Sequence, residues 1–98
     1  MIREDLDIKT IENEIAKTFL VDRDLFYERH GKKNICYAKH MLWLILHDEL
    51  GMSHREISKQ YGRTKRMIEI AISRFRFSVN NQRQDKVWYE ELKNRLGI

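Results

Sequence analysis

Six consecutive residues near the middle of the chain, Met41 to Leu46, are all apolar. They belong to a stretch that predicts one long helix from about Asn34 to Leu50, with Asn34 as its N-cap and Gly51 as the residue that ends it. A helix that is apolar around its whole circumference has to be enclosed by other elements. The sequence therefore predicts that this helix is the axis of the hydrophobic core.

The composition favours helices for the other elements as well. The chain has 98 residues, enough for one small domain with one core, and it contains no Pro and only 4 Gly. An all-β fold would need more of both residues for its turns. We therefore expect a single all-α domain that spans residues 1–98.

Apolar periodicity and capping residues predict further helices around the central one, about six helices in all. The clearest local signal is the pair Ser53 and Glu56, which has the spacing of a capping box. The first of these helices is expected to start at Asp7 or Thr10 and to end at Phe19. The others are expected at about residues 22–28, 53–61, 64–79 and 84–96. The sequence Asn80-Asn81-Gln82 is expected to separate the last two segments.

Charge is distributed unevenly along the chain. Residues 1–28 carry four Lys or Arg and eight Asp or Glu, and residues 29–84 carry twelve and four, which gives net charges of −4 and +8. In the acidic part, Glu12 and Glu14 lie in the early turns of a predicted helix, where the helix dipole favours carboxylates. A basic block of this kind usually faces phosphate, so the charge pattern points to a nucleic-acid partner.

The stretch from Glu56 to Ile68 has the spacing of a helix-turn-helix. Tyr61 is expected to face inward, Gly62 supplies a turn residue that tolerates positive φ, and Thr64 caps the second helix. The exposed start of that helix carries side chains that can donate to guanine or phosphate, or accept from cytosine. The pattern predicts binding of double-stranded DNA, with the helix 64–79 in the major groove.

Two groups of residues are expected to contact the DNA. Residues at the start of the helix 64–79 face base edges, and residues in the basic loop 29–33 and on the neighbouring helices face phosphates. The full set is Arg29, Lys32, Lys33, Lys39, His40, Ser53, His54, Arg55, Lys59, Arg63, Thr64, Lys65, Arg66, Glu69 and Ser73. For His30, Arg74, Arg76 and Arg83 the choice between a phosphate contact and a solvated side chain stays open.

Catalytic and cofactor chemistry finds no support in the sequence. The one Cys excludes an internal disulfide framework, and Cys36, His40 and His47 lack the further ligands that a metal site needs. There is no Gly-rich phosphate loop and no arrangement typical of nucleophilic catalysis. We predict a protein that is not an enzyme and that uses no cofactor, metal or small-molecule substrate.

Membrane insertion and secretion are not expected either. No apolar run approaches the roughly 18 residues of a membrane span, and the first five residues do not resemble a signal peptide. The sequence thus favours a cytoplasmic protein.

From Ile11 to the C-terminus the sequence resembles the C-terminal DNA-binding domain of the bacterial replication initiator DnaA. The order of features carries the resemblance: an opening helix, a short second element, the basic loop, the long helix, the run Gly51-Met52-Ser53-His54-Arg55-Glu56-Ile57 and the pair Tyr61-Gly62. The resemblance implies an all-helical fold related to the Trp repressor, with phosphate contacts from the basic loop. It also implies a minor-groove contact at the start of the long helix, where Lys39 takes the place of an arginine.

The chain departs from that family at the positions that read DNA. The family has a Gly-Arg-Asp-His-Thr-Thr-Val run, whereas this chain has Gly62-Arg63-Thr64-Lys65-Arg66-Met67-Ile68. Recognition of the initiator's own site therefore does not follow from the resemblance. Since the sequence has no ATPase domain, we expect a small stand-alone protein that acts in replication initiation or regulation of a mobile element, or in transcription regulation.

A second function stays open beside DNA binding. Ile70 and Phe77 lie off the inner face of the predicted helix 64–79, whereas Trp43, Phe75 and Trp88 have the spacing of core residues. Ile70 and Phe77 either meet the helix 84–96, or form with it a surface for a protein partner or a second copy of the chain. In the latter case the chain is a helical protein–protein interaction module with an incidental basic face.

Overall fold

The structure, a computed structural model, describes residues 7–29 and 31–98. These residues form five α-helices and one 3₁₀ helix, and they contain no strand. The elements are α1 (Ile8–Phe19), the 3₁₀ helix η2 (Arg23–Tyr27), α2 (Lys33–Asp48), α3 (His54–Tyr61), α4 (Lys65–Asn81) and α5 (Arg83–Leu96). The all-α class is confirmed, but the expected second helix is a short 3₁₀ helix, so there are five α-helices and not six.

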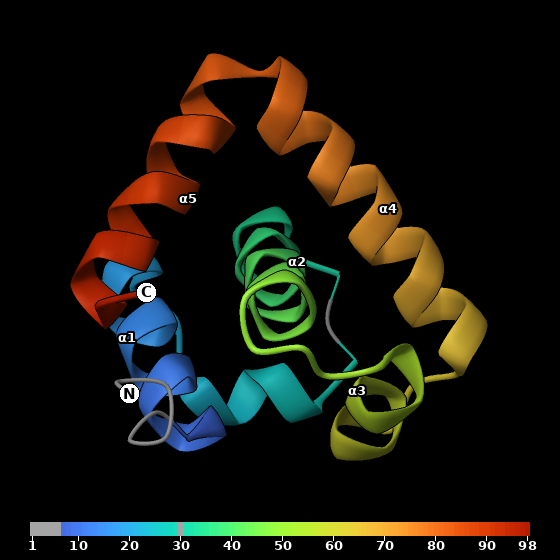
Figure 1. The fold of residues 1–98 in the computed structure, drawn as a ribbon. Helices are drawn as coiled ribbons and strands as arrows, with labels where there is room; N and C mark the ends of the chain where they lie inside the picture. The colour runs from blue at the N-terminus through green and yellow to red at the C-terminus, as the bar shows by residue number, and fades with distance from the viewer. Residues whose placement is uncertain (1–6, 30) are drawn as a thin grey trace.

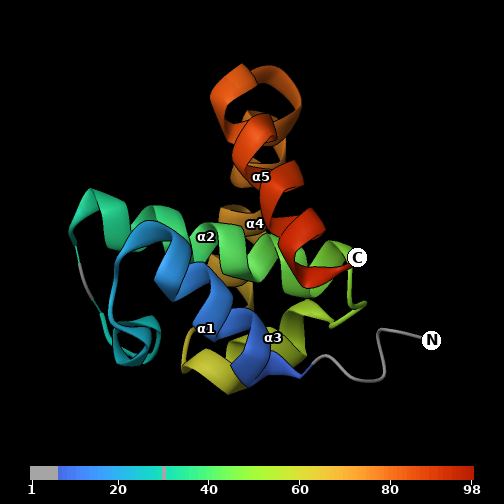
Figure 2. The ribbon, with the colours of Figure 1, turned by 90° about the vertical axis from the view of Figure 1, so that its left-hand side faces the viewer.

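The long helix α2 lies at the centre of the fold, as its apolar sequence predicts. Met41 to Leu46 are all buried, and α1, η2, α3 and α4 all contact α2. Figure 1 looks along α2 and shows α4 and α5 as an inverted V above it, with α1, η2 and α3 below. In Figure 2, α1 lies in front of α2 and α4 lies behind it. The core surrounds α2 because no side of its apolar centre can face water.

Side-chain caps set the starts of α1, α3 and α4, and those of α3 and α4 are the caps that the sequence predicts. Asp7 caps α1 through a hydrogen bond of 2.8 Å from the Thr10 N–H. Ser53 and Glu56 form the predicted capping box, with bonds of 3.0 and 2.8 Å between side chains and backbone. Thr64 caps α4 with a bond of 3.1 Å to its hydroxyl oxygen. These bonds act within four residues, so the sequence alone contains the information for them.

Two boundary predictions are wrong. Asn34 does not cap α2, because Lys32 already has the extended backbone of an N-cap residue and the helix begins directly after it. The expected break at residues 80–82 is reduced to Gln82, which ends α4 and starts α5 at once. Asn81 stays in α4, where its side-chain amide donates to the Phe77 carbonyl at 2.8 Å, and the buried Val79 holds this last turn against the core.

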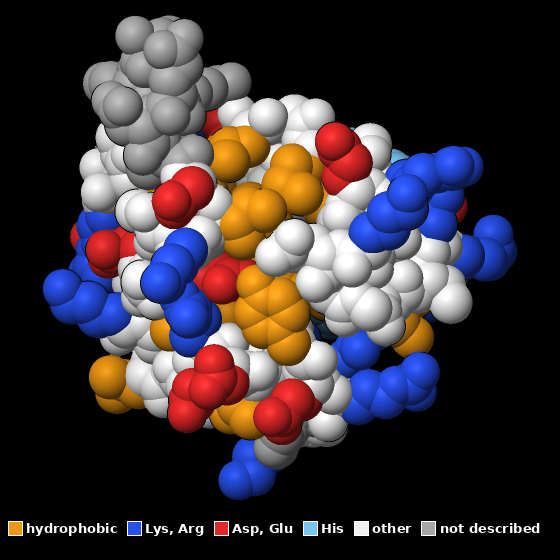
Figure 3. Space-filling model, turned by 90° about the horizontal axis from the view of Figure 1, so that it is seen from below, with side chains coloured by type: hydrophobic (Ala, Val, Ile, Leu, Met, Phe, Trp, Pro, Cys, Tyr) orange, Lys and Arg blue, Asp and Glu red, His pale blue; other side chains and the backbone are white. Residues whose placement is uncertain are grey.

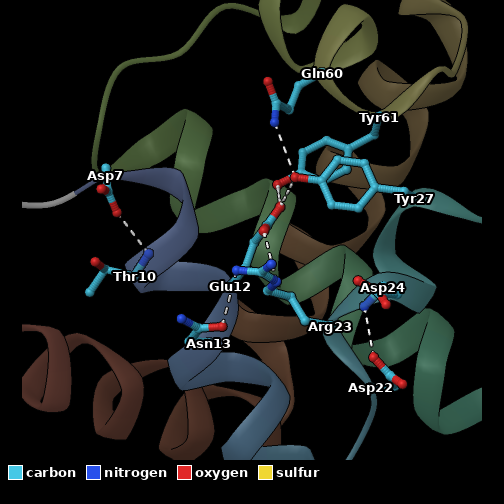
Figure 4. Close-up of polar contacts among 10 residues, drawn as sticks. All are labelled: Asp7, Thr10, Glu12, Asn13, Asp22, Arg23, Asp24, Tyr27, Gln60 and Tyr61. Atoms are coloured by element: carbon cyan, nitrogen blue, oxygen red, sulfur yellow. Dashed lines mark hydrogen bonds and ion pairs between the residues drawn. The ribbon is translucent and has the colours of Figure 1, made fainter.

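A buried carboxylate, that of Glu12, connects three elements in the lower part of the molecule (Figure 4). Glu12 is 2% exposed, and its Oε2 accepts from the Tyr27 hydroxyl at 2.5 Å and from the Tyr61 hydroxyl at 2.6 Å. The Arg23 Nε lies 3.9 Å from Oε1. Tyr27 comes from η2 and Tyr61 from the last turn of α3, so Glu12 joins α1 to both. This role goes well beyond the dipole effect expected for Glu12.

We predict that Tyr61→Phe lowers the free energy of unfolding at pH 7 by about 1.5–3 kcal/mol, because it removes a hydroxyl that donates to a buried charged group. Tyr27→Phe is the matched comparison, since it removes the other donor to the same oxygen. Tyr27 is 42% exposed, so water can replace its hydroxyl and the loss should be smaller. Urea unfolding of both variants tests this order, and equal losses would contradict it.

Alkaline pH should reduce the effect of the same substitution. Burial, and then the hydrogen bond to Glu12, raise the pKa of Tyr61 above its ordinary value of 10.0. The stabilisation from Tyr61 is therefore complete below about pH 10 and is lost as the pH rises further, because the unfolded chain then releases a proton that the folded chain keeps. The difference in unfolding free energy between wild type and Tyr61→Phe should shrink by about 1.4 kcal/mol per pH unit above 10. If the difference in unfolding free energy between wild type and Tyr61→Phe stays constant between pH 9 and 11, the Tyr61 hydroxyl is not buried against a carboxylate.

Candidate functional site

The chain turns from α3 into α4 at Gly62, whose φ of +66° lies in the left-handed region that favours glycine. The Gly62 N–H closes the end of α3 by donating to the Ser58 carbonyl, and the Arg63 N–H donates to the same oxygen at 3.1 Å. Thr64 then caps α4. The turn is so short that the first residues of α4 come out directly at the surface.

The side chains predicted to face base edges fall into two groups, those with and those without a hydrogen bond or ion pair to another described residue. Arg66 and Ser73 are exposed, and neither side chain has a hydrogen bond or ion pair with another described residue. The Glu69 carboxylate lies 3.4 Å from the Lys65 Nζ and 3.8 Å from the His54 Nδ1. Thr64 is exposed but uses its hydroxyl oxygen in the cap of α4. Arg66 is thus the exposed cation at the start of α4 that has no partner within the described part of the chain.

The residues predicted on α3 have different environments. Arg55 and Lys59 are exposed, whereas Ser53 is held in the capping box. The ring of His54 stacks on that of His47 from α2, with centroids 4.2 Å apart. Burial, and then the neighbouring His47, lower the pKa of His54 below its ordinary value of 6.5. His54 is therefore uncharged at neutral pH, so a phosphate would meet Arg55 and Lys59 as the cations of this helix.

The basic loop does not form one cluster. Lys32 is exposed at the N-cap of α2, and Lys33 borders a hollow of about 490 Å³ that also includes Asp85 of α5. Arg29 borders a different hollow, on the side of α4. His30 lies outside the described residues, so its predicted role is not addressed by the structure.

The hollow beside Arg29, here called the cationic hollow, collects positive side chains from three parts of the chain. It has a volume of about 300 Å³ and is bordered by Arg29, by Lys39 and His40 of α2, and by Arg63 of the turn. Lys39 is 4% exposed, and its ammonium donates to the Glu28 carbonyl. The Arg63 Nη2 donates to the same oxygen at 2.8 Å. Lys39, which was expected to contact phosphate, is thus buried, and it borders this hollow and not the open surface.

In the cationic hollow, the buried ammonium of Lys39 lies beside other positive charges, of which Arg29 is exposed. Burial, and then the charge of Arg63, lower the pKa of Lys39. Burial, and then the charge of Lys39, lower the pKa of His40. Among the described residues, no carboxylate forms an ion pair with Arg29, Lys39 or Arg63. The carboxylate of Glu28 acts on Lys39 in the opposite direction but forms no ion pair with it, so the hollow keeps an excess of positive charge.

A second hollow, of about 530 Å³, continues the first along α4. It is bordered by Arg66, Ile70 and Arg74, and it shares His40 and Met67 with the cationic hollow. No acidic residue of the described chain lines either of the two. This side of α4 thus presents apolar side chains between arginines.

The structure also shows the environments of the residues whose roles the sequence left open. The Arg76 guanidinium donates to both carboxylate oxygens of Asp48, at 3.0 and 2.6 Å, and so ties α4 to the end of α2. Arg74 and Arg83 are exposed. Ile70 and Phe77 are 40% and 67% exposed, so neither is buried against α5.

The lower face of the molecule has a different character (Figure 3). Hydrophobic side chains gather at its centre, with acidic and basic side chains around them. It carries a hollow of about 620 Å³ whose lining includes Asp7, Lys9, Glu12 and Arg23. Charges of both signs therefore offset one another here, in contrast to the side of α4.

No protein-family model and no curated protein matches the chain. The resemblance to the DnaA domain stays a prediction that rests on the quoted residues. Among the described residues, no three His, Cys, Asp or Glu side chains come together as a metal site would require. None of the described helices combines the length and apolar character needed to cross a bilayer.

We predict that Lys39→Met raises the pKa of His40, because it removes the positive charge next to the imidazole. The pKa should stay below the ordinary 6.5, since burial, the larger cause of the shift, remains. NMR titration of the His40 ring protons measures the change, with Lys17→Met on the exposed side of α1 as the matched control. An unchanged His40 pKa in Lys39→Met would mean that the two side chains do not lie together.

Proposed function

We propose that the protein binds double-stranded DNA, with α3 and α4 acting as a helix-turn-helix and the start of α4 in the major groove. The observation that carries this proposal is the pair of adjoining hollows beside α4, bordered by Arg29, Arg63, Arg66 and Arg74 and lined by no described carboxylate. DNA presents closely spaced phosphates, and cations that no carboxylate neutralises gain most from contact with them. An enzyme or a cofactor-binding protein has no comparable observation in its favour.

The exposed side chains of α4 suit contact with base edges. Arg66 can donate to the two acceptors of guanine in the major groove, which is about 12 Å wide and admits a helix. Met67 and Ile70 are 47% and 40% exposed, and their apolar side chains suit the methyl group of thymine. The proposed division of roles is base contact by the first two turns of α4 and phosphate contact by Arg55, Lys59 and the loop 29–33.

The resemblance to the C-terminal domain of DnaA supports the same docking. It also suggests a role in replication initiation or regulation of a mobile element, or in transcription regulation. Lys65, Arg66 and Met67 stand where that family has base-reading residues, and Met67 cannot donate a hydrogen bond. We therefore propose a preference for the initiator's own site of no more than about tenfold, less than one good bidentate base contact can provide.

A second candidate function is docking of a protein partner or a second copy through α4 and α5. It is favoured by the exposure of Phe77 and Val87, which are 67% and 57% exposed near the junction of these helices. Large apolar side chains at a surface often mark such contacts. Salt separates the two functions, because an apolar contact barely responds to salt whereas phosphate contacts weaken steeply.

We predict that the double variant Lys65→Gln/Arg66→Gln binds a labelled mixed-sequence duplex about tenfold or more weakly than wild type. The slope of log affinity against log salt should fall by about 0.9 for each phosphate that the variant no longer neutralises. Fluorescence anisotropy over a series of salt concentrations measures both quantities. The matched control is Lys9→Gln/Lys17→Gln, which removes the same charge from exposed positions on α1.

Two outcomes would count against the proposal. Equal losses in the two double variants would mean that only net charge matters and that α4 is not the contact. Wild-type affinity that stays flat from low to physiological salt would exclude phosphate contacts and favour the protein-partner function.

A further inference from the structure

We propose that the cationic hollow is a binding site for a single phosphate group, held between Arg29, Lys39 and Arg63. A phosphate group can come from two sources, the DNA backbone or a small phosphorylated molecule. If the phosphate belongs to the DNA backbone, the inference rests on the proposed function. If it belongs to a small molecule, the inference is independent of that function.

The first argument is the convergence of three cations from separate parts of the chain. Arg29 follows η2, Lys39 lies in α2, and Arg63 lies in the turn before α4. A carboxylate carries one negative charge in one plane, whereas a phosphate carries up to two charges on oxygens that point in several directions. Three cations contributed by separate parts of the chain therefore suit phosphate better than carboxylate.

The second argument is a buried ammonium with which no described carboxylate forms an ion pair, because the charge of Glu28 acts on it less than that of Arg63 does. Lys39 is 4% exposed, and buried lysines are almost always paired with an opposite charge. Its hydrogen bond to a described acceptor goes to the neutral Glu28 carbonyl, which Arg63 shares. Lys39 and Arg63 donate to the same neutral oxygen and repel each other. An anion bound between them would attract both and so offset this repulsion.

The third argument is the size and wall of the hollow. Its volume of about 300 Å³ exceeds the ~30 Å³ of one water molecule about tenfold, which leaves room for a phosphate group with some of its hydration. Trp43 and Met67 form part of the wall, and apolar walls strengthen charge interactions by lowering the local polarity. The indole N–H of Trp43 is buried and has no acceptor among the described residues. Such a donor is unusual in a protein interior, and it is a second sign that this region lacks an acceptor.

The competing explanation is that Lys39 and Arg63 only fasten the Glu28 carbonyl to α2 and to the turn. The two explanations predict opposite results for Lys39→Met, which keeps the length of the side chain and removes the charge. A fastening role predicts a lower melting temperature. A phosphate site predicts an unchanged or higher melting temperature without phosphate, because an apolar residue that replaces a poorly compensated buried charge is often neutral or stabilising.

The test is thermal unfolding of the full chain in sodium phosphate and in sodium chloride of equal ionic strength, at about pH 7. With phosphate well above its dissociation constant, wild type should melt about 5 °C higher than in chloride. Lys39→Met and Arg63→Met should lose this difference, and Lys17→Met should keep it. The Arg29 side chain is exposed and has no hydrogen bond or ion pair with another described residue. Arg29→Gln should therefore reduce the melting-temperature difference between phosphate and chloride without affecting the fold. This variant decides the test if Lys39→Met and Arg63→Met do not fold.

A second measurement separates the two sources of phosphate. If the hollow takes a backbone phosphate, inorganic phosphate at constant ionic strength should compete with the duplex, and Arg29→Gln should bind the duplex about tenfold more weakly. If it takes a small molecule, the phosphate-dependent stabilisation should remain while duplex affinity does not change. Failure of the chain to bind any duplex would refute the proposed function and leave the phosphate site standing. Equal melting in phosphate and chloride, or an equal phosphate effect in wild type and Arg29→Gln, would overturn the inference.

Discussion

The apolar centre of α2 has to be covered on every side, and the arrangement of the other elements follows from this requirement. Met41 to Leu46 are buried between α1, α3, α4 and η2, and α4 and α5 close the upper side (Figure 1). Enclosure of the centre also draws in the preceding turn of the same helix. Lys39 and His40 lie there, and both end up in the wall of the cationic hollow. The positive charge inside this region is therefore a consequence of burying the helix that carries it.

Hydrogen bonds from tyrosine hydroxyls to carboxylates hold the surrounding elements in place. Tyr61 and Tyr27 share the carboxylate of Glu12, Tyr37 of α2 donates to Asp85 of α5 at 2.7 Å, and Tyr89 of α5 donates to Glu49 at 2.7 Å. Each bond joins segments that are far apart in the sequence. A hydroxyl next to a carboxylate satisfies a buried or half-buried charge without the desolvation of a second ion.

These internal contacts also determine which charged side chains of the described chain remain unpaired at the surface. Glu12, Glu49 and Asp85 accept from tyrosines, and Asp48 pairs with Arg76. Acidic side chains are thus occupied within the fold, while the arginines beside α4 have no carboxylate in the two hollows that they border. A net charge of only +4 thereby becomes a concentrated positive region on one side of the molecule. The DNA-binding proposal and the phosphate site both depend on this separation of charge.

The positions of the helices could be predicted from the sequence because the interactions that define them are local. The caps at Ser53 and Thr64 act within four residues, and the inner face of α4 follows from residues three and four apart that are all buried, such as Ile68, Ile72 and Phe75. The exposed start of α4, with Arg66, follows from the same periodicity. For these features the chain needs no distant partner, so the sequence contains the whole argument.

The partners of Glu12 and Lys39 were decided by tertiary structure alone. Glu12 lies at helical spacing from Ile8 and Ile15, which was a signal for an inward position, but its function depends on Tyr61, 49 residues further along the chain. Lys39 follows a basic loop in the sequence and has the pattern of a surface cation. It is buried because the end of η2 brings the Glu28 carbonyl against α2, where the turn also delivers Arg63. Whether a charge is buried depends on which distant groups reach it, because a charge can leave water only where packing supplies it with a partner.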